Sequence, residues 1–86
     1  MVNKVLKFSA QWCAPCRALG ETLSKVEDVT IENVDVDDNE ELCEKYHIRN
    51  VPILIFLNDK NEELGRSVGN ISLDAFYNKL KELNEK

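Results

Sequence analysis

Two cysteines three positions apart carry the chemistry that this sequence is best equipped to perform. Cys13 and Cys16 follow an apolar segment that is typical of a strand and ends at Ala10. They precede a segment with helical spacing, in which Leu19, Leu23 and Val26 share one side. Two thiols so close in the chain can form and break one disulfide reversibly. The first chemistry to consider is therefore thiol–disulfide exchange.

The expected start of the helix assigns different roles to the two sulfur atoms. Cys13 lies at the helix N-terminus, where unpaired backbone N–H groups and the helix dipole favour a thiolate, so we expect it to attack. Cys16 lies one turn further on the same side and is placed to resolve the mixed disulfide that Cys13 forms. Pro15 fits the first helical turn, where its missing N–H costs nothing, and it stiffens the loop between the thiols.

A zinc site is the alternative use of this motif, because a C-x-x-C pair is also half of such a site. Cys43 and His47 are spaced four apart on an expected helix and would complete a set of four ligands. However, the chain has more periodic helices and apolar strands than a small zinc domain needs. We therefore expect Cys43 to be a small buried apolar residue and His47 a surface residue at the helix end, with no metal bound.

Length and composition limit the other classes of function. With 86 residues the chain is expected to form one domain, residues 1–86, with a modest core. A net charge of −5 without a basic cluster argues against nucleic-acid binding. No segment is as apolar as a membrane span, and the N-terminus lacks the features of a secretory signal. An unpaired third cysteine suits a reducing compartment, so we expect a cytoplasmic protein that does not bind membranes.

The hydrophobic pattern predicts an α/β domain with the element order β-α-β-α-β-β-α. The expected elements are a strand ending at residue 10, a helix after Cys13, a strand at 29–36, a helix capped by Asp38 or Asn39, strands at 51–57 and 62–68, and a helix capped by Ser72. The β-α-β order implies a parallel pair of strands, and the turn at 58–61 implies an antiparallel hairpin. The sheet should therefore be mixed, with the site at the C-terminal end of the first strand.

Pro52 is a second residue that indicates a functional site, because it stands at the head of a strand that is otherwise apolar throughout. A proline in a central strand removes one ladder hydrogen bond. A cis Val51–Pro52 bond would turn the backbone and offer the polar groups of Val51 to an extended substrate. An ordinary trans proline that opens the strand fits the residues equally well.

Four segments of the chain resemble the motifs of the thioredoxin family, in order and at family spacing. They are residues 8–17 with Trp12-Cys13-Ala14-Pro15-Cys16, residues 34–37 (V-D-V-D), residues 46–52 (Y-H-I-R-N-V-P) and residues 68–69 (V-G). The resemblance implies the thioredoxin fold, with a four-stranded mixed sheet flanked by three helices and a cis Pro52 facing the disulfide. It also implies reduction of protein disulfides by Cys13 and Cys16, in a groove lined by Trp12, Ala14, Pro15, Val51, Pro52 and Gly69.

The resemblance also implies the setting in which the chain would work. Its electrons would come from a separate reductase of the thioredoxin-reductase type, its substrates would be protein disulfides, and it would be a monomer that serves electron transport and cell redox homeostasis. No cofactor is implied beyond the Cys13–Cys16 disulfide. One alternative is a glutaredoxin-like enzyme that uses glutathione, although the usual C-P-Y-C is absent. Another is a binding role as an accessory subunit of another protein.

One departure from the family concerns the start of the sheet. Full-length members carry an additional strand and helix ahead of the segment that matches Val2 to Ser9, so the resemblance is to a minimal form of the fold. The strand at 29–36 should then be a sheet edge, and one sheet face should have only the second helix as cover. Lower stability, or a partner at that face, would follow.

Other departures lie around the thiols. The family usually has a buried aspartate six residues before the first cysteine, and a lysine accompanies it; this sequence has Lys7 and Asn33 there. An inward Lys7 would favour thiolates and weaken the protein as a reductant. Alternatively, its ammonium group reaches solvent or pairs with Asp35. Ala14 and Asn50 replace glycines that are usual in the family, with small expected effects on the potential and on partner preference.

Overall fold

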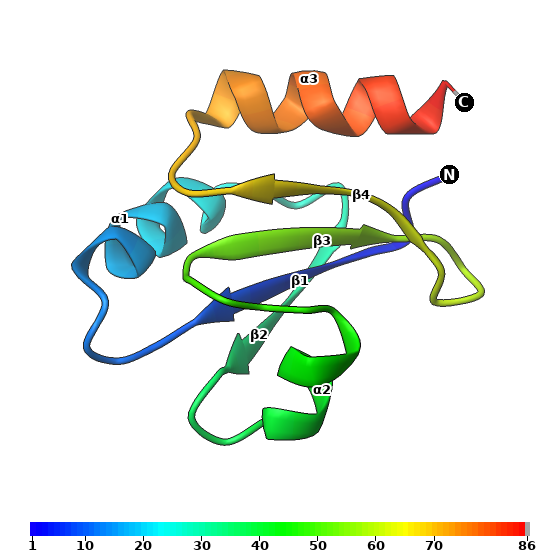
Figure 1. Ribbon diagram of the computed structural model, residues 1–86. Coiled ribbons are helices and arrows are strands. Elements are labelled where there is room, and N and C mark those ends of the chain that lie inside the picture. Colours follow the sequence, from blue (N-terminus) through cyan, green and yellow to red (C-terminus); the bar gives the residue numbers. More distant parts are fainter. Residues whose placement is uncertain (86) are drawn as a thin grey trace.

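The computed structural model describes residues 1–85 and confirms the predicted order of elements (Figure 1). The elements are β1 (Lys4–Ser9), α1 (Ala14–Leu23), β2 (Thr30–Asp35), α2 (Glu40–Lys45), β3 (Ile53–Leu57), β4 (Glu63–Val68) and α3 (Leu73–Asn84). Among these, no helix is long and apolar enough to cross a membrane.

The four strands form one mixed sheet with the order β2-β1-β3-β4. β1 pairs with β2 in parallel and with β3 antiparallel, and β3 and β4 form the predicted antiparallel hairpin. β2 is an edge strand, as expected. All five residues of β3 are buried, which agrees with the central strand that its continuous apolar run predicted.

Several boundaries differ from the prediction by one to three residues. β3 begins at Ile53 rather than at Val51, because the Val51–Pro52 peptide bond is cis and turns the chain before the ladder starts. α1 ends at Leu23, where the N–H of Ser24 closes the last turn on the carbonyl of Gly20. Val26 therefore packs against the core from the following loop rather than from the helix.

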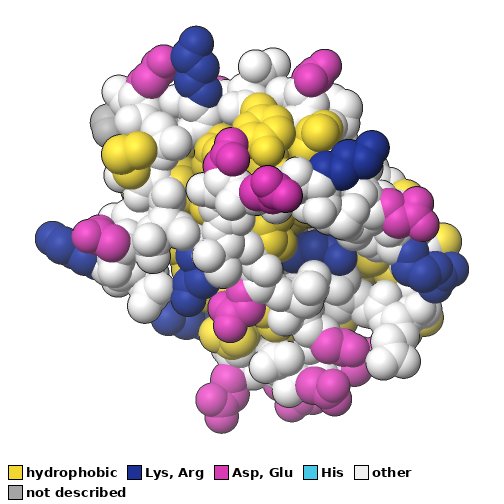
Figure 2. Space-filling model, turned by 180° about the vertical axis from the view of Figure 1, so that it is seen from behind, with side chains coloured by type: hydrophobic (Ala, Val, Ile, Leu, Met, Phe, Trp, Pro, Cys, Tyr) yellow, Lys and Arg dark blue, Asp and Glu magenta, His cyan; other side chains and the backbone are white. Residues whose placement is uncertain are grey.

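One face of the sheet is covered by α1 and α3. Their apolar sides meet alternate residues of β1 and β3 in one cluster, which contains Val5, Leu19, Leu23, Leu54, Phe56, Phe76, Leu80 and Leu83. The rings of Phe56 and Phe76 lie 5.7 Å apart at the centre of this layer. Seen from behind, hydrophobic side chains surface in the middle of the molecule with charged side chains around them (Figure 2). This layer ties the disulfide-bearing helix to the sheet.

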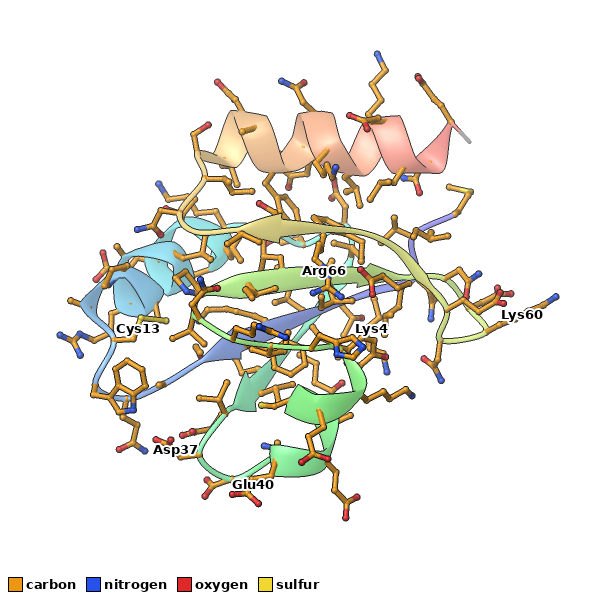
Figure 3. All side chains as sticks on the ribbon, in the orientation of Figure 1. Lys4, Cys13, Asp37, Glu40, Lys60 and Arg66 are labelled. Carbon is orange, nitrogen blue, oxygen red and sulfur yellow. A yellow bond between two sulfur atoms is a disulfide. The ribbon has the colours of Figure 1, made fainter. Side chains whose placement is uncertain are left out.

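The other face has α2 as its only helix, which confirms the expectation of sparse cover. Its apolar cluster contains Leu6, Phe8, Val34, Tyr46, Ile53, Ile55 and Leu57. The strand register places two ion pairs on this same face, Lys4 with Glu32 at 3.7 Å and Arg66 with Glu63 at 2.7 Å. Lys4 and Arg66 extend in front of the sheet on the side of α2 (Figure 3). Lys4 lines a pocket on this face together with Leu6 and Leu57, so its aliphatic stem adds cover to the strands.

The start of the chain and the end of α3 lie together, far from the N-terminal end of α1 (Figure 1). The backbone N–H of Val2 donates to the side-chain oxygen of Asn84 at 2.6 Å, which joins the start of the chain to the end of α3.

Candidate active site

Cys13 and Cys16 are joined by a disulfide at the point where the loop after β1 enters α1. Cys13 is the N-cap residue of α1, and its Sγ accepts a hydrogen bond from the backbone N–H of Cys16 at 3.2 Å. The same N–H would stabilise a Cys13 thiolate after reduction. Both cysteines are largely covered, with exposed fractions of 5% for Cys13 and 2% for Cys16.

The surroundings of the disulfide are apolar and include the segment before β3. Ala10, Val36 and Val51 pack against the two cysteines. The Val51–Pro52 bond is cis, the alternative that the resemblance implied. The N–H of Gly69 donates to the carbonyl of Pro52 at 2.9 Å, so the end of β4 is fixed beside this turn.

Position 69 favours glycine because of its backbone conformation. Its φ of +87° lies in the region that side chains disfavour, and no heavy atom lies within 4 Å of the position that a Cβ would take. The backbone at Gly69 is therefore uncovered at the position that a side chain would take.

Trp12 projects from the loop before Cys13 and is 70% exposed. Its indole N–H donates to Oδ2 of Asp37 at 3.2 Å, which holds the ring beside the thiols. Cys13 and Asp37 lie at the same end of the molecule, opposite Lys60 (Figure 3). Asp37 is the last residue of the V-D-V-D motif, and no role was predicted for it. Only the fold places that strand end beside Trp12.

An apolar pocket of about 130 Å³ lies between Trp12 and the segment before Pro52. Its lining residues are Trp12, Val36, Cys43, Ile48, Arg49, Asn50 and Val51. Of the residues expected in the groove, Trp12 and Val51 meet here, while Ala14 and Pro15 lie exposed in the first turn of α1. Val36, Cys43, Ile48 and Arg49 are additions to that set, and they come from the end of β2, from α2 and from the loop after α2, which explains why spacing did not reveal them.

Cys43 is a half-buried thiol in this pocket rather than a partner of the disulfide. Burial raises the pKa of the Cys43 thiol, and the nearby carboxylates of Glu40 and Asp37 raise it further. A thiol with a raised pKa remains protonated at neutral pH and is a poor nucleophile. Within residues 1–85, no group of three or more His, Cys, Asp or Glu side chains is arranged to hold a metal ion.

The sequence model of the thioredoxin family matches residues 2–82, nearly the whole described chain. The chain belongs to the thioredoxin family. Among its curated thioredoxin relatives, thioredoxin H5 of rice is 40% identical over 84 residues, which cover 93% of this chain and 61% of the rice protein. The thioredoxin of Mycoplasmoides gallisepticum is 41% identical over 59 residues, or 59% of its length. The chain thus spans about three fifths of these thioredoxins.

Solved thioredoxin structures share the fold. Thioredoxin-2 of a malaria parasite superposes with a TM-score of 0.83 at 26% identity, covering 92% of this chain and 81% of that one. A thioredoxin variant from Halobacterium salinarum superposes with a TM-score of 0.81 at 32% identity, and the match covers 93% of this chain and 73% of that one. The four-stranded mixed sheet with three helices is therefore a thioredoxin fold, as the motifs implied.

Lys7, which stands where the family usually has aspartate, points into the protein. Its side chain is 9% exposed, and its ammonium group donates to the amide oxygen of Asn33 at 3.3 Å. The salt bridges within residues 1–85 do not include Lys7, so the alternative pairing with Asp35 is not formed. Burial lowers the pKa of the Lys7 ammonium, because the charged form is partly removed from water.

Replacing Lys7 with methionine should stabilise this thioredoxin-family chain by about 1 kcal/mol at neutral pH, because it removes a desolvated charge that has one neutral partner. The folded-state pKa of Lys7 is lowered, so the ammonium opposes folding while it is charged in both states. This cost shrinks as the pH rises through the lowered pKa, and it is gone above the ordinary value of about 10.4. Urea unfolding of the oxidised protein should therefore give a gain that declines at alkaline pH.

Lys4→Met is the matched control, since Lys4 lies on the same strand but is half-exposed and paired with Glu32. It should change stability by less than about 0.5 kcal/mol. A Lys7→Met variant less stable than the parent at pH 7 would contradict the expected effect of burial.

Proposed function

We propose that this chain, as the single domain 1–86, is a protein-disulfide reductase that works through the Cys13/Cys16 couple. The observation that carries the proposal is the disulfide at the N-cap of α1, which lies beside the cis Val51–Pro52 turn and the pocket under Trp12. A thiol at a helix N-terminus gives an effective nucleophile and leaving group. The apolar surroundings suit an extended protein segment rather than a small charged substrate.

The reaction transfers two electrons in two exchange steps. The Cys13 thiolate attacks one sulfur of the substrate disulfide, that S–S bond breaks, and the first substrate thiolate leaves. The Cys16 thiolate then attacks Sγ of Cys13, which releases the second substrate thiolate and forms the Cys13–Cys16 disulfide. The proton lost by each attacking thiol balances the proton gained by each substrate thiolate.

The substrate groove that we propose contains Trp12, Ala14, Pro15, Val51, Pro52 and Gly69. The polar groups of Val51 and the carbonyl of Gly69 lie next to Pro52, where an extended segment could pair with them, while the N–H of Gly69 is bonded to Pro52. Asp37 supports the groove by holding Trp12. We propose that no cofactor is used beyond the disulfide and that a separate thioredoxin-reductase-type donor reduces it. The working form would be a cytoplasmic monomer that serves cell redox homeostasis.

The experiment is the reduction of insulin disulfides by dithiothreitol with and without catalytic amounts of the protein, together with the reduction potential of the Cys13/Cys16 couple. We expect catalysis well above the dithiothreitol background and a potential between about −270 and −230 mV, because an inward Lys7 would raise the potential above the value of about −270 mV that is usual for thioredoxin. No acceleration would overturn the proposal. A potential near about −200 mV combined with turnover linked to glutathione would instead support a glutaredoxin-like enzyme.

A further inference from the structure

Lys7 is the one charged side chain in the buried set of residues 1–85, and the exchange steps above do not use it. It lies on β1 two residues after Val5 and therefore on the sheet face that α1 covers. Its ammonium group has the amide oxygen of Asn33 as its hydrogen-bond acceptor. A buried cation without a carboxylate partner keeps an electric field that acts on its neighbours.

The ammonium group of Lys7 lies against α1, at the turn that follows Cys16. The Lys7 Nζ lies 3.0 Å from the position that a Cβ at residue 20 would occupy, so Gly20 provides the space for the ammonium group. Gly20 follows Cys16 by four residues, which is about one helical turn or 5.4 Å along the axis. Lys7 and Cys16 also line one surface pocket of about 280 Å³ between α1 and β2. The ammonium group thus lies about one helical turn from Cys16, and Lys7 and Cys16 share this pocket.

Two other charged groups face the same pocket, Arg17 from α1 and Asp35 from β2. The guanidinium of Arg17 is exposed and donates to the carbonyl of Gln11 at 3.0 Å. Oδ1 of Asp35 accepts from the N–H of Asp37 at 2.9 Å, which turns the carboxylate toward its own loop. The pocket therefore has a net positive charge, and Lys7 is its least solvated member.

We propose that Lys7 is a positioning residue whose ammonium group stabilises the Cys16 thiolate, both in the reduced protein and in the mixed disulfide. This inference rests on the proposed function and names the group that prepares its second step. Cys16 loses its proton to solvent through the pocket, and its sulfur then attacks Sγ of Cys13. The bond from Cys13 to the substrate breaks, and the leaving thiolate takes a proton from solvent. Lys7 remains protonated throughout, so it contributes charge and no proton.

The first test measures the pKa of Cys16 directly. In a Cys13→Ser, Cys43→Ser background Cys16 is the only thiol, so the ultraviolet absorbance of the thiolate against pH reports its ionisation. Lys7→Met should raise the pKa of Cys16 by about one, the lower end of what a neighbouring opposite charge produces. Asn33→Asp, at an exposed edge-strand position, should shift it in the same direction by giving Lys7 a carboxylate partner.

Lys4→Met is the control, because Lys4 is on the same strand but extends from the opposite face. It should leave the pKa of Cys16 unchanged. An unchanged pKa in both Lys7→Met and Asn33→Asp would overturn the proposal, as would an equal shift in Lys4→Met. This ionisation is measured without turnover, so it remains informative even if the protein fails to reduce insulin.

The second test follows the resolving step in the otherwise native sequence. A mixed disulfide of Cys13 with an aromatic thiol releases that thiol when Cys16 attacks, and the rate against pH gives the ionisation of Cys16. Lys7→Met should move the midpoint up by about one pH unit, and Lys7→Arg should restore it. At a pH above the midpoint of the variant, Lys7→Met should shift the dithiol–disulfide equilibrium about tenfold toward the disulfide. This corresponds to a reduction potential about 30 mV more negative than that of the parent. A structural role alone would leave the midpoint in place.

Discussion

Replacing Cys16 with serine should stop turnover and leave the protein covalently attached to its substrate through Cys13. In the parent, Cys16 is one turn away on the same helix and bonded to Cys13, so resolution is intramolecular. Well-oriented intramolecular groups act at effective concentrations of about 10⁵ M or more, far above any free thiol. We expect insulin reduction to fall at least about 10³-fold. Non-reducing electrophoresis should show the mixed disulfide accumulating.

Cys43→Ser provides the matched control, with the same substitution at the third thiol. Cys43 lines the apolar pocket beside Trp12, but its raised pKa keeps the thiol protonated. Turnover of Cys43→Ser should therefore stay within about twofold of the parent. Cys13→Ser should neither turn over nor form the adduct. If Cys16→Ser retained turnover, or if Cys43→Ser removed it, the roles of the three cysteines would have to be reassigned.

Truncating Phe56 to alanine should destabilise the protein by about 4 kcal/mol. Phe56 is fully buried in the middle of β3 and contacts Phe76 of α3 across the core. Its removal leaves a cavity between the central strand and the helix, in a domain whose total stability is about 5–15 kcal/mol. Denaturant unfolding of the oxidised variant should have a much lower midpoint concentration than that of the parent, and its melting temperature should also be lower.

The comparison for Phe56→Ala is a truncation at an exposed apolar residue of the sheet. Val68 is 61% exposed at the end of β4, so Val68→Ala should cost less than about 0.5 kcal/mol. A loss of under about 1 kcal/mol at Phe56 would mean that α3 packs less tightly on the sheet than these contacts imply.

The elements of the fold could be predicted because each has a pattern that a single principle explains. The unbroken apolar run in β3 requires cover on both faces. α3 places Phe76, Leu80 and Leu83 on one side, and its cap Ser72 accepts from the N–H of Ala75 at 3.1 Å. Cys13 at the start of α1 follows from the change from strand to helix spacing. These are local signals, and local signals are visible in one sequence.

The relations between distant segments could not be predicted from spacing alone. The residues around Pro52 fit either isomer, and the contacts of this segment with Gly69 and the cysteines come from elsewhere in the chain. The bond between Trp12 and Asp37 joins two loops, and no periodicity links them. The orientation of Lys7 depends on the small size of Gly20, thirteen residues later on another element. Each of these features is a tertiary contact that forms only once the sheet is assembled.

The position of the two chain ends has a practical consequence for how this domain can be attached to other molecules. Val2 and Asn84 are bonded to each other at the pole opposite Cys13. A fused domain, a flexible tether or a solid support joined at either end would lie away from the end of the molecule that carries the disulfide. On a tether, its local concentration near a neighbouring target would be set by linker length rather than by expression level. Ends this close also favour circular permutation, with new termini opened at the turn around Lys60.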